Sequence, residues 1–167
     1  MYACLFGDRR WRLPEPRDGF VFHGVGQSAL PSLAGRFVGY VTTTVPDYAP
    51  DFDEVKVFDL RRGRLVRTLP ARAPDASLGF STIHDIALKR NASLAWTAAG
   101  TEGFGGEGTA WAEVRAAPIG AHRSRRLDSA TGPNASADIQ LDSLELRRDH
   151  RSVTWIHAGR RRDAALR

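Results

Sequence analysis

The clearest alternation of apolar and polar positions lies in residues 54–70, EVKVFDLRRGRLVRTLP. A strand-sized apolar run meets a basic turn, and a second run with every other residue apolar then ends at Pro70. Two such runs separated by a short glycine-containing turn indicate a β-hairpin. Glycine readily adopts the positive φ that a tight connection requires. The pattern therefore predicts a hairpin whose turn lies at residues 61–64.

Strand-sized segments recur along the whole chain, whereas the i, i+3, i+4 pattern of a helix is not sustained anywhere. β-branched and aromatic residues, which favour strands, are dense in the segment RFVGYVTTT at residues 36–44. The sequence therefore predicts an all-β fold. The predicted strands are 2–6, 10–13, 20–25, 29–33, 36–44, the hairpin 54–69, 82–88, 93–98, 111–117, 125–129, 139–146, 152–157 and 161–166.

Aromatic residues mark a repeat of long period. Tyr40, Trp96 and Trp155 each fall in a predicted strand, at separations of 56 and 59 residues. Leu60 lies 20 residues after Tyr40, and Ala116 lies 20 residues after Trp96. Self-similarity of this kind indicates a repeat architecture, so we interpret the three aromatic residues as core anchors of a repeated unit.

We label the four strands of this unit A, B, C and D. Strands B and C are apolar on both faces, as expected where sheets pack against sheets on each side, whereas strand D alternates as an outer strand does. Residues 1–167 thus form a single domain. Its approximate repeats are a C–D hairpin at 1–15, A–B–C–D units at 28–70 and 82–129, and an A–B–C unit at 139–167.

A meander of four-stranded units stacked face to face is the architecture of a β-propeller. Residues 57–70, VFDLRRGRLVRTLP, resemble the C–D hairpin of WD40-like and quinoprotein-like propeller repeats, in which an aspartate and a glycine-containing turn recur. The whole chain also resembles uncharacterised, secreted repeat proteins of bacteria with GC-rich genomes. The resemblance implies a partial β-propeller of about three four-stranded antiparallel blades. A β-sandwich of unrelated hairpins is the alternative.

Three units are too few to close a propeller, which needs about four to eight blades, and residue 2 already falls in a predicted strand. We therefore expect Met1 to be an internal start within a larger, secreted propeller, or copies of the chain to associate. Residues 1–11 show no signal-peptide pattern, and no apolar run is long enough to span a bilayer. The single cysteine, Cys4, excludes an intrachain disulfide and assigns no compartment.

The connections of the predicted propeller separate by length and by charge. The B–C and D–A connections leave on one face and are long and acidic, except for the last B–C turn, Gly159–Arg162, which is short and basic. The A–B and C–D turns on the other face are mostly short and rich in arginine. Long loops on a rigid scaffold commonly carry function, so we predict that the acidic face and the neighbouring inner strand bind a ligand. The candidate ligand-binding residues are Asp47, Asp51, Asp53, Glu54, His84, Asp85, Glu102 and Glu107.

Two motifs in these loops suggest chemistry but fit it poorly. The loop VPDYAPDFDE at residues 45–54 offers oxygen donors for calcium, yet it lacks EF-hand spacing, so we favour a solvated acidic loop. GFGGEG at residues 103–108 satisfies G-x-G-x-x-G, but a predicted strand follows it where a dinucleotide site needs a helix. Glu102 and Glu107 would also repel phosphate. We therefore predict a flexible loop there.

His84 and Asp85 fall on an inner strand, near where a propeller channel would run. A buried histidine bonded to a local acceptor is the interpretation we favour over a catalytic or metal-binding role. The chain has no HExxH, HxH or G-x-S-x-G motif, so we predict no catalytic residue, no metal and no cofactor.

The net charge is +5 and the isoelectric point is about 10.1. Such a basic domain suggests nucleic-acid binding. The arginines are scattered over turns, however, and Lys56 and Lys89 are the only lysines, an imbalance that a GC-rich coding sequence produces. We therefore predict no nucleic-acid partner. We expect a non-enzymatic binding or scaffold module with a protein or glycan partner. The alternative is the remnant of a propeller-fold hydrolase or lyase that depends on calcium.

Overall fold

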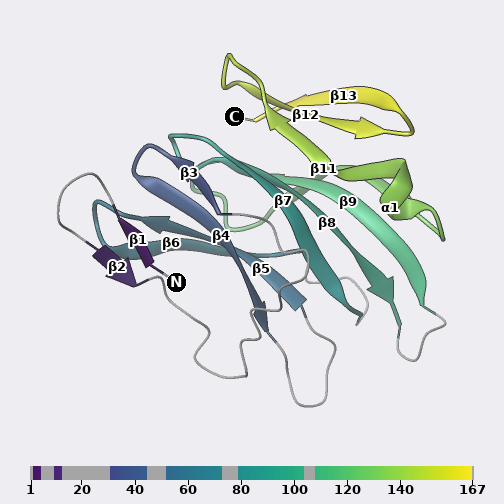
Figure 1. The fold of residues 1–167 in the computed structure, drawn as a ribbon, viewed down its shortest axis with the longest axis horizontal. Coiled ribbons are helices and arrows are strands. Elements are labelled where there is room, and N and C mark those ends of the chain that lie inside the picture. The colour runs from purple at the N-terminus through teal and green to yellow at the C-terminus, as the bar shows by residue number, and fades with distance from the viewer. Residues whose placement is uncertain are drawn as a thin grey trace.

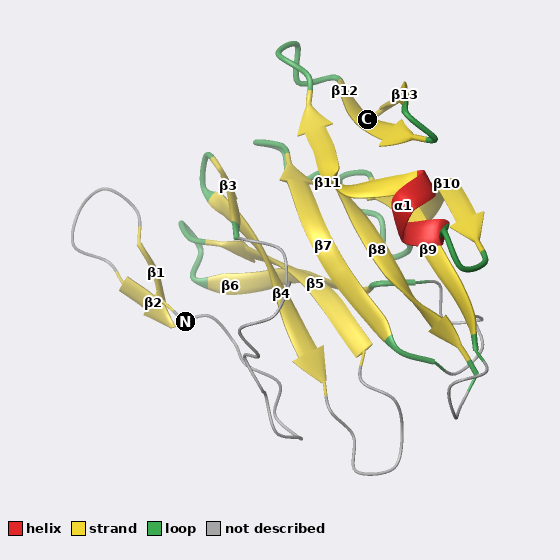
Figure 2. Cartoon of the chain, turned by 45° about the vertical axis from the view of Figure 1, so that its right-hand side comes forward, coloured by secondary structure: helices red, strands yellow, loops and turns green. Residues whose placement is uncertain are grey.

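The chain forms strands almost throughout the part that the structure describes. This computed structural model describes residues 2–4, 10–12, 31–44, 52–72, 79–103 and 108–166. Within these ranges the single helix is α1, Ala135–Asp138, which has four residues (Figures 1 and 2). The predicted all-β fold is therefore confirmed. The predicted strand at residues 20–25 lies outside the described residues.

The strands pair in chain order, as antiparallel meanders. The hairpin at the N-terminal end consists of β1 (Tyr2–Cys4) and β2 (Arg10–Arg12). What we call the first unit consists of β3 (Ser32–Ala34), β4 (Phe37–Thr44), β5 (Phe52–Asp59) and β6 (Arg64–Pro70). The second unit consists of β7 (Ser81–Leu88), β8 (Leu94–Glu102), β9 (Thr109–Ala117) and β10 (Arg125–Thr131). The third unit consists of β11 (Ile139–Leu146), β12 (Ser152–His157) and β13 (Arg160–Ala165).

The first two units belong to one eight-stranded sheet, because a short parallel bridge pairs β5 with β7 at Phe52 and Ser81. The third unit is a separate three-stranded sheet beside the second (Figure 2). In a meander, a strand pairs with its neighbour in the chain, so the contacts within each unit are local in sequence.

Two apolar interfaces hold the three units together. Along β8, alternate side chains point to opposite faces of the sheet. Leu94, Trp96 and Ala98 lie in a cluster with buried residues of the first unit, whereas Ala95 and Ala99 lie in a cluster with buried residues of the third unit. The second unit is thus buried on both faces, as its sequence predicts.

The aromatic residues that mark the repeat occupy corresponding places. The indole N–H of Trp96 donates to the carbonyl of Ala71, just beyond β6 of the first unit, at 3.0 Å. The indole N–H of Trp155 donates to Asp128 Oδ2 in β10 of the second unit at 2.7 Å. Each indole therefore reaches the last strand of the preceding unit or its end. Tyr40 lies in a third buried cluster, on the face of the first unit that points away from the second.

The hairpin predicted at residues 54–70 is present, with its turn between β5 and β6. The carboxylate of Asp59 accepts hydrogen bonds from the backbone N–H groups of Arg61 and Arg62, at 3.0 and 3.2 Å. Gly63 has a φ of 61°, in the left-handed region that glycine adopts without strain. The aspartate and the glycine of the sequence pattern therefore shape the turn directly.

Replacing Trp96 with alanine should lower the free energy of unfolding by about 3–5 kcal/mol, because it opens a cavity between two units. The side chain is fully buried, and its N–H bond to Ala71 is also lost. Urea unfolding of the purified protein measures the change. Val66→Ala, at an exposed position of β6, is the control and should cost less than about 1 kcal/mol. A cost for Trp96→Ala as small as that of the control would contradict this packing.

Candidate functional site

The predicted ligand-binding residues separate into two groups. Asp47, Asp51 and Glu107 lie outside the described residues. The other five lie on strands: Asp53 and Glu54 on β5, His84 and Asp85 on β7, and Glu102 at the end of β8.

Asp53 joins the first unit to the second. Its carboxylate accepts a hydrogen bond from Thr43 Oγ1 at 2.6 Å and one from the backbone N–H of Ile83 at 2.8 Å. Its own backbone N–H donates to Ser81 Oγ at 3.4 Å. The side chain is almost fully buried, and both carboxylate oxygens serve donors of the protein. These contacts give Asp53 a structural task at the strand bridge.

His84 and Asp85 lie on β7, the first strand of the second unit, and are half-buried. Burial lowers the pKa of His84, although the charges of Asp53 and Asp142 oppose that shift. Burial also raises the pKa of Asp85, against the hydrogen bonds from the backbone amides of Ile86 and Leu144. The environment thus favours the uncharged form of both groups, as desolvation does.

A cluster of charged residues lies at the interface between the first and second units. Arg72, just beyond β6, contacts the carboxylate of Glu102 and lies 3.3 Å from Glu113 Oε1, and its guanidinium covers the ring of Trp111 at 4.7 Å. Arg115 contacts the other oxygen of Glu113. Glu102 is therefore an ion-pair partner within this network. Glu113 is only 2% exposed, and its place was not predicted.

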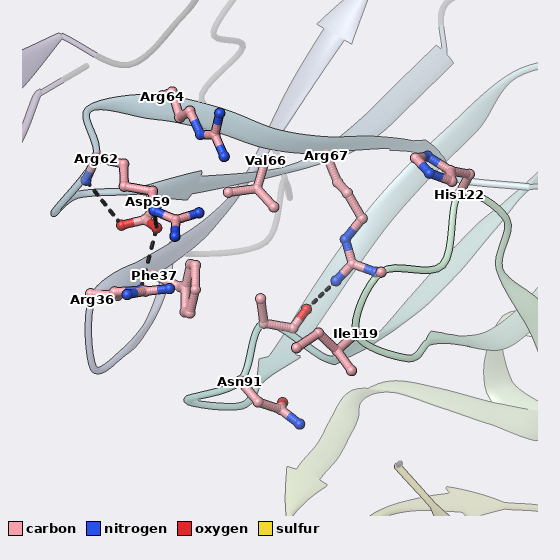
Figure 3. A pocket seen from close by; sticks show the side chains of 12 residues that line it. Arg36, Phe37, Asp59, Arg62, Arg64, Val66, Arg67, Asn91, Ile119 and His122 are labelled. Carbon is pink, nitrogen blue, oxygen red and sulfur yellow. Dashed lines mark hydrogen bonds and ion pairs between the residues drawn. The ribbon is translucent and has the colours of Figure 1, made fainter.

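An open cleft of about 290 Å³ lies between the first and second units, at the end that carries the short turns (Figure 3). It is formed by the β3–β4 and β5–β6 turns, by β6, and by the β7–β8 and β9–β10 connections. The residues that line it are Arg36, Phe37, Asp59, Arg62, Arg64, Val66, Arg67, Asn91, Ala92, Ile119, Gly120 and His122.

Arg67 extends from β6 toward the second unit and is only 7% exposed (Figure 3). Its terminal nitrogens donate to three backbone carbonyls, those of Ala92, Pro118 at 2.6 Å and Ala121 at 3.2 Å. Its Nε donates to no acceptor of the described residues. Burial lowers the pKa of Arg67. Since no carboxylate of the described residues pairs with it, its positive charge is balanced only by carbonyl dipoles.

Among the described residues of the cleft wall, Asp59 is the one that carries a carboxylate. It already accepts two backbone hydrogen bonds and lies 3.3 Å from Arg36 Nε and 3.9 Å from Arg62 Nε. The side chains of Arg64 and His122, which line the cleft, form no hydrogen bond or ion pair with the described residues. The wall therefore carries more positive than negative charge.

None of the five predicted residues that the structure describes lines this cleft. The sequence did show the arginine-rich turn at residues 61–64. The length of the acidic loops, however, led to the prediction that the ligand binds at the opposite, acidic face. Arg67 was not singled out either, since one arginine in an alternating strand resembles any exposed position. The signal that could have found the cleft is Ile119, an apolar residue in the longest of the C–D turns.

The described residues contain no group of three or more His, Cys, Asp or Glu side chains placed to hold a metal ion. The same part of the chain contains no helix long and apolar enough to cross a membrane. Neither a protein-family model, nor a curated protein, nor a solved structure matches this chain.

Replacing Glu113 with glutamine should destabilise the protein by about 3 kcal/mol, because it leaves the buried Arg115 beside a neutral group. Chemical denaturation at neutral pH measures the difference. Glu145→Gln is the matched control, since Glu145 pairs with Arg161 at the surface, with side chains 70% and 66% exposed. Such pairs contribute at most about 1 kcal/mol. Equal effects of the two substitutions would show that the buried network does not stabilise the interface.

Proposed function

We propose that this chain is a non-enzymatic binding module, a partial β-propeller that presents its connections to a protein or glycan partner. The observation that carries the proposal is the repeated, face-to-face packing of antiparallel units, with Trp96 and Trp155 each reaching the preceding unit. Propellers are built from units of this kind. Scaffolds of stacked repeats commonly bind through the loops on their faces.

The inner strands of the second and third units support this arrangement. These inner strands are the first strand of each unit, β7 in the second unit and β11 in the third. They lie in contact with each other. The carboxyl group of Asp85 on β7 interacts with the backbone amide of Leu144 on β11. Adjacent first strands are expected where blades surround a common axis.

The outward face of the third unit differs from that of the second. The two units can be aligned by placing Trp155 on Trp96 and then following the pairing of the strands on either side. Four apolar residues of the second unit then correspond to polar residues of the third unit. Ala87, Ala95, Val114 and Ala116 correspond in this way to Glu145, Thr154, Arg161 and Asp163. Arg161 bonds to Glu145 Oε2 at 2.8 Å and to Thr154 Oγ1 at 3.0 Å. A polar outer face of this kind is typical of a terminal repeat.

The test separates binding from turnover. The wild-type protein and His84→Ala are assayed with chromogenic esters, phosphomonoesters and glycosides, with and without calcium, and are screened against arrays of glycans and peptides. We expect no turnover that depends on His84, together with array binding that His84→Ala retains. Hydrolysis that disappears in His84→Ala would contradict the proposal and favour a propeller-fold hydrolase.

A further inference from the structure

The cleft between the first and second units has the chemistry of a peptide-binding site. We propose that it binds an acidic segment of a partner polypeptide, with carboxylates on Arg62 and Arg64 and an apolar side chain between Val66 and Ile119. This inference rests on the proposed binding function and specifies the chemistry of its partner.

The charge of the cleft selects an anion. Of the described residues that line it, Arg36, Arg62, Arg64 and Arg67 are positively charged, and Asp59 alone is negatively charged. The buried charge of Arg67 has no carboxylate partner among the described residues, and buried charges are ordinarily paired. An anion in the cleft would be attracted by a field that water screens poorly.

The arginines at the rim are available to a ligand. Arg62 is 58% exposed and lies only at the edge of contact with Asp59, at 3.9 Å. The side chain of Arg64 is exposed and donates to no acceptor of the described residues. Both side chains belong to the hairpin turn and the start of β6 beside the cleft (Figure 3). A guanidinium group binds a carboxylate through two parallel hydrogen bonds, which gives direction as well as attraction.

The apolar walls favour a polypeptide among anionic partners. Ile119 is 61% exposed and Val66 42% exposed, and both side chains line the same cleft, as does the buried side chain of Phe37 (Figure 3). A single exposed apolar side chain needs no explanation, but here two adjoin a set of arginines. The phosphate backbone of a nucleic acid and a sulfated glycan have no apolar side chain that could pack between Val66 and Ile119. An acidic peptide can supply one.

The cleft is open to solvent, so it encloses part of a ligand rather than a whole cofactor. Its volume of about 290 Å³ is at the lower end of the range of about 300–1,000 Å³ that small-molecule sites have. It can accept one apolar side chain with flanking carboxylates while the rest of the segment stays in water. Arginine and apolar residues are both characteristic of the centres of protein–protein interfaces, and the cleft is lined by both.

The experiment measures binding of a fluorescein-labelled decapeptide of glutamates with two central leucines, by anisotropy in low salt. Its competitors are the glutamine version of the peptide, a heparin fragment and a single-stranded oligonucleotide. The test variant is Arg62→Glu/Arg64→Glu. The matched control is Arg160→Glu/Arg162→Glu, which makes the same charge change at exposed positions of β13 on the third unit. Circular dichroism and thermal melting establish that both variants are folded.

We expect saturable binding that weakens at least tenfold in Arg62→Glu/Arg64→Glu, weakens less than threefold in the β13 control, and falls as salt rises. Ile119→Ser should weaken binding of the leucine-containing peptide but not that of an all-glutamate peptide. No binding, equal losses in both charge variants, or binding of heparin or DNA alone would overturn the inference. If the peptide fails while an array ligand still binds, this inference fails and the proposed binding function stands.

Discussion

The structure depends on burial of the second unit on both faces. Its strands contribute Leu94, Trp96 and Ala98 to one interface, and Ala95, Val114 and Ala116 to the other. A strand with apolar side chains on both faces cannot satisfy them in a single exposed sheet. The first and third units are therefore needed to complete its core. The order of the chain then brings the β3–β4, β5–β6, β7–β8 and β9–β10 connections together at one end of the first two units.

Polar groups within the apolar interface between the first two units add direction to this packing. Glu113 receives Arg72 from one side and Arg115 from the other, and Arg67 reaches across to carbonyls of two connections of the second unit. Apolar contacts alone tolerate sliding, whereas a buried charge is stable only where its partners lie. This network therefore fixes how the two units are aligned. The cleft is a consequence, because it lies where β6 meets those connections.

The sequence was sufficient for most strands and for their pairing within each unit, because alternation and aromatic spacing are local signals. It did not predict the bridge between β5 and β7 that joins the first two units into one sheet. The segment RFVGYVTTT became β4, the 54–70 hairpin became β5 and β6, and the residues around Trp96 and Trp155 became second strands of their units. The tasks of individual charged residues were much harder to predict. Asp53 bonds to Ile83 across 30 positions, and Arg67 bonds to Pro118 across 51. Contacts between such distant residues leave no periodic trace in a sequence.

The place of the cleft escaped prediction for a related reason. Loop length favoured the acidic connections, since long loops commonly carry function, and three of the candidate residues there lie outside the described part of the chain. The cleft is assembled from short turns of two different units, and its arginines come from segments that look like ordinary solvated turns. Only the packing of the units shows that Arg36, Arg64 and Ile119 share one wall.

Hydrogen exchange read by mass spectrometry tests most directly whether the units are stable only through one another. Amides of β4, β5, β7, β8 and β9 are expected to exchange with one common free energy of opening, which Trp96→Ala lowers in both units by the same amount. Separate free energies for the two units, with the effect of Trp96→Ala confined to the second, would contradict this expectation.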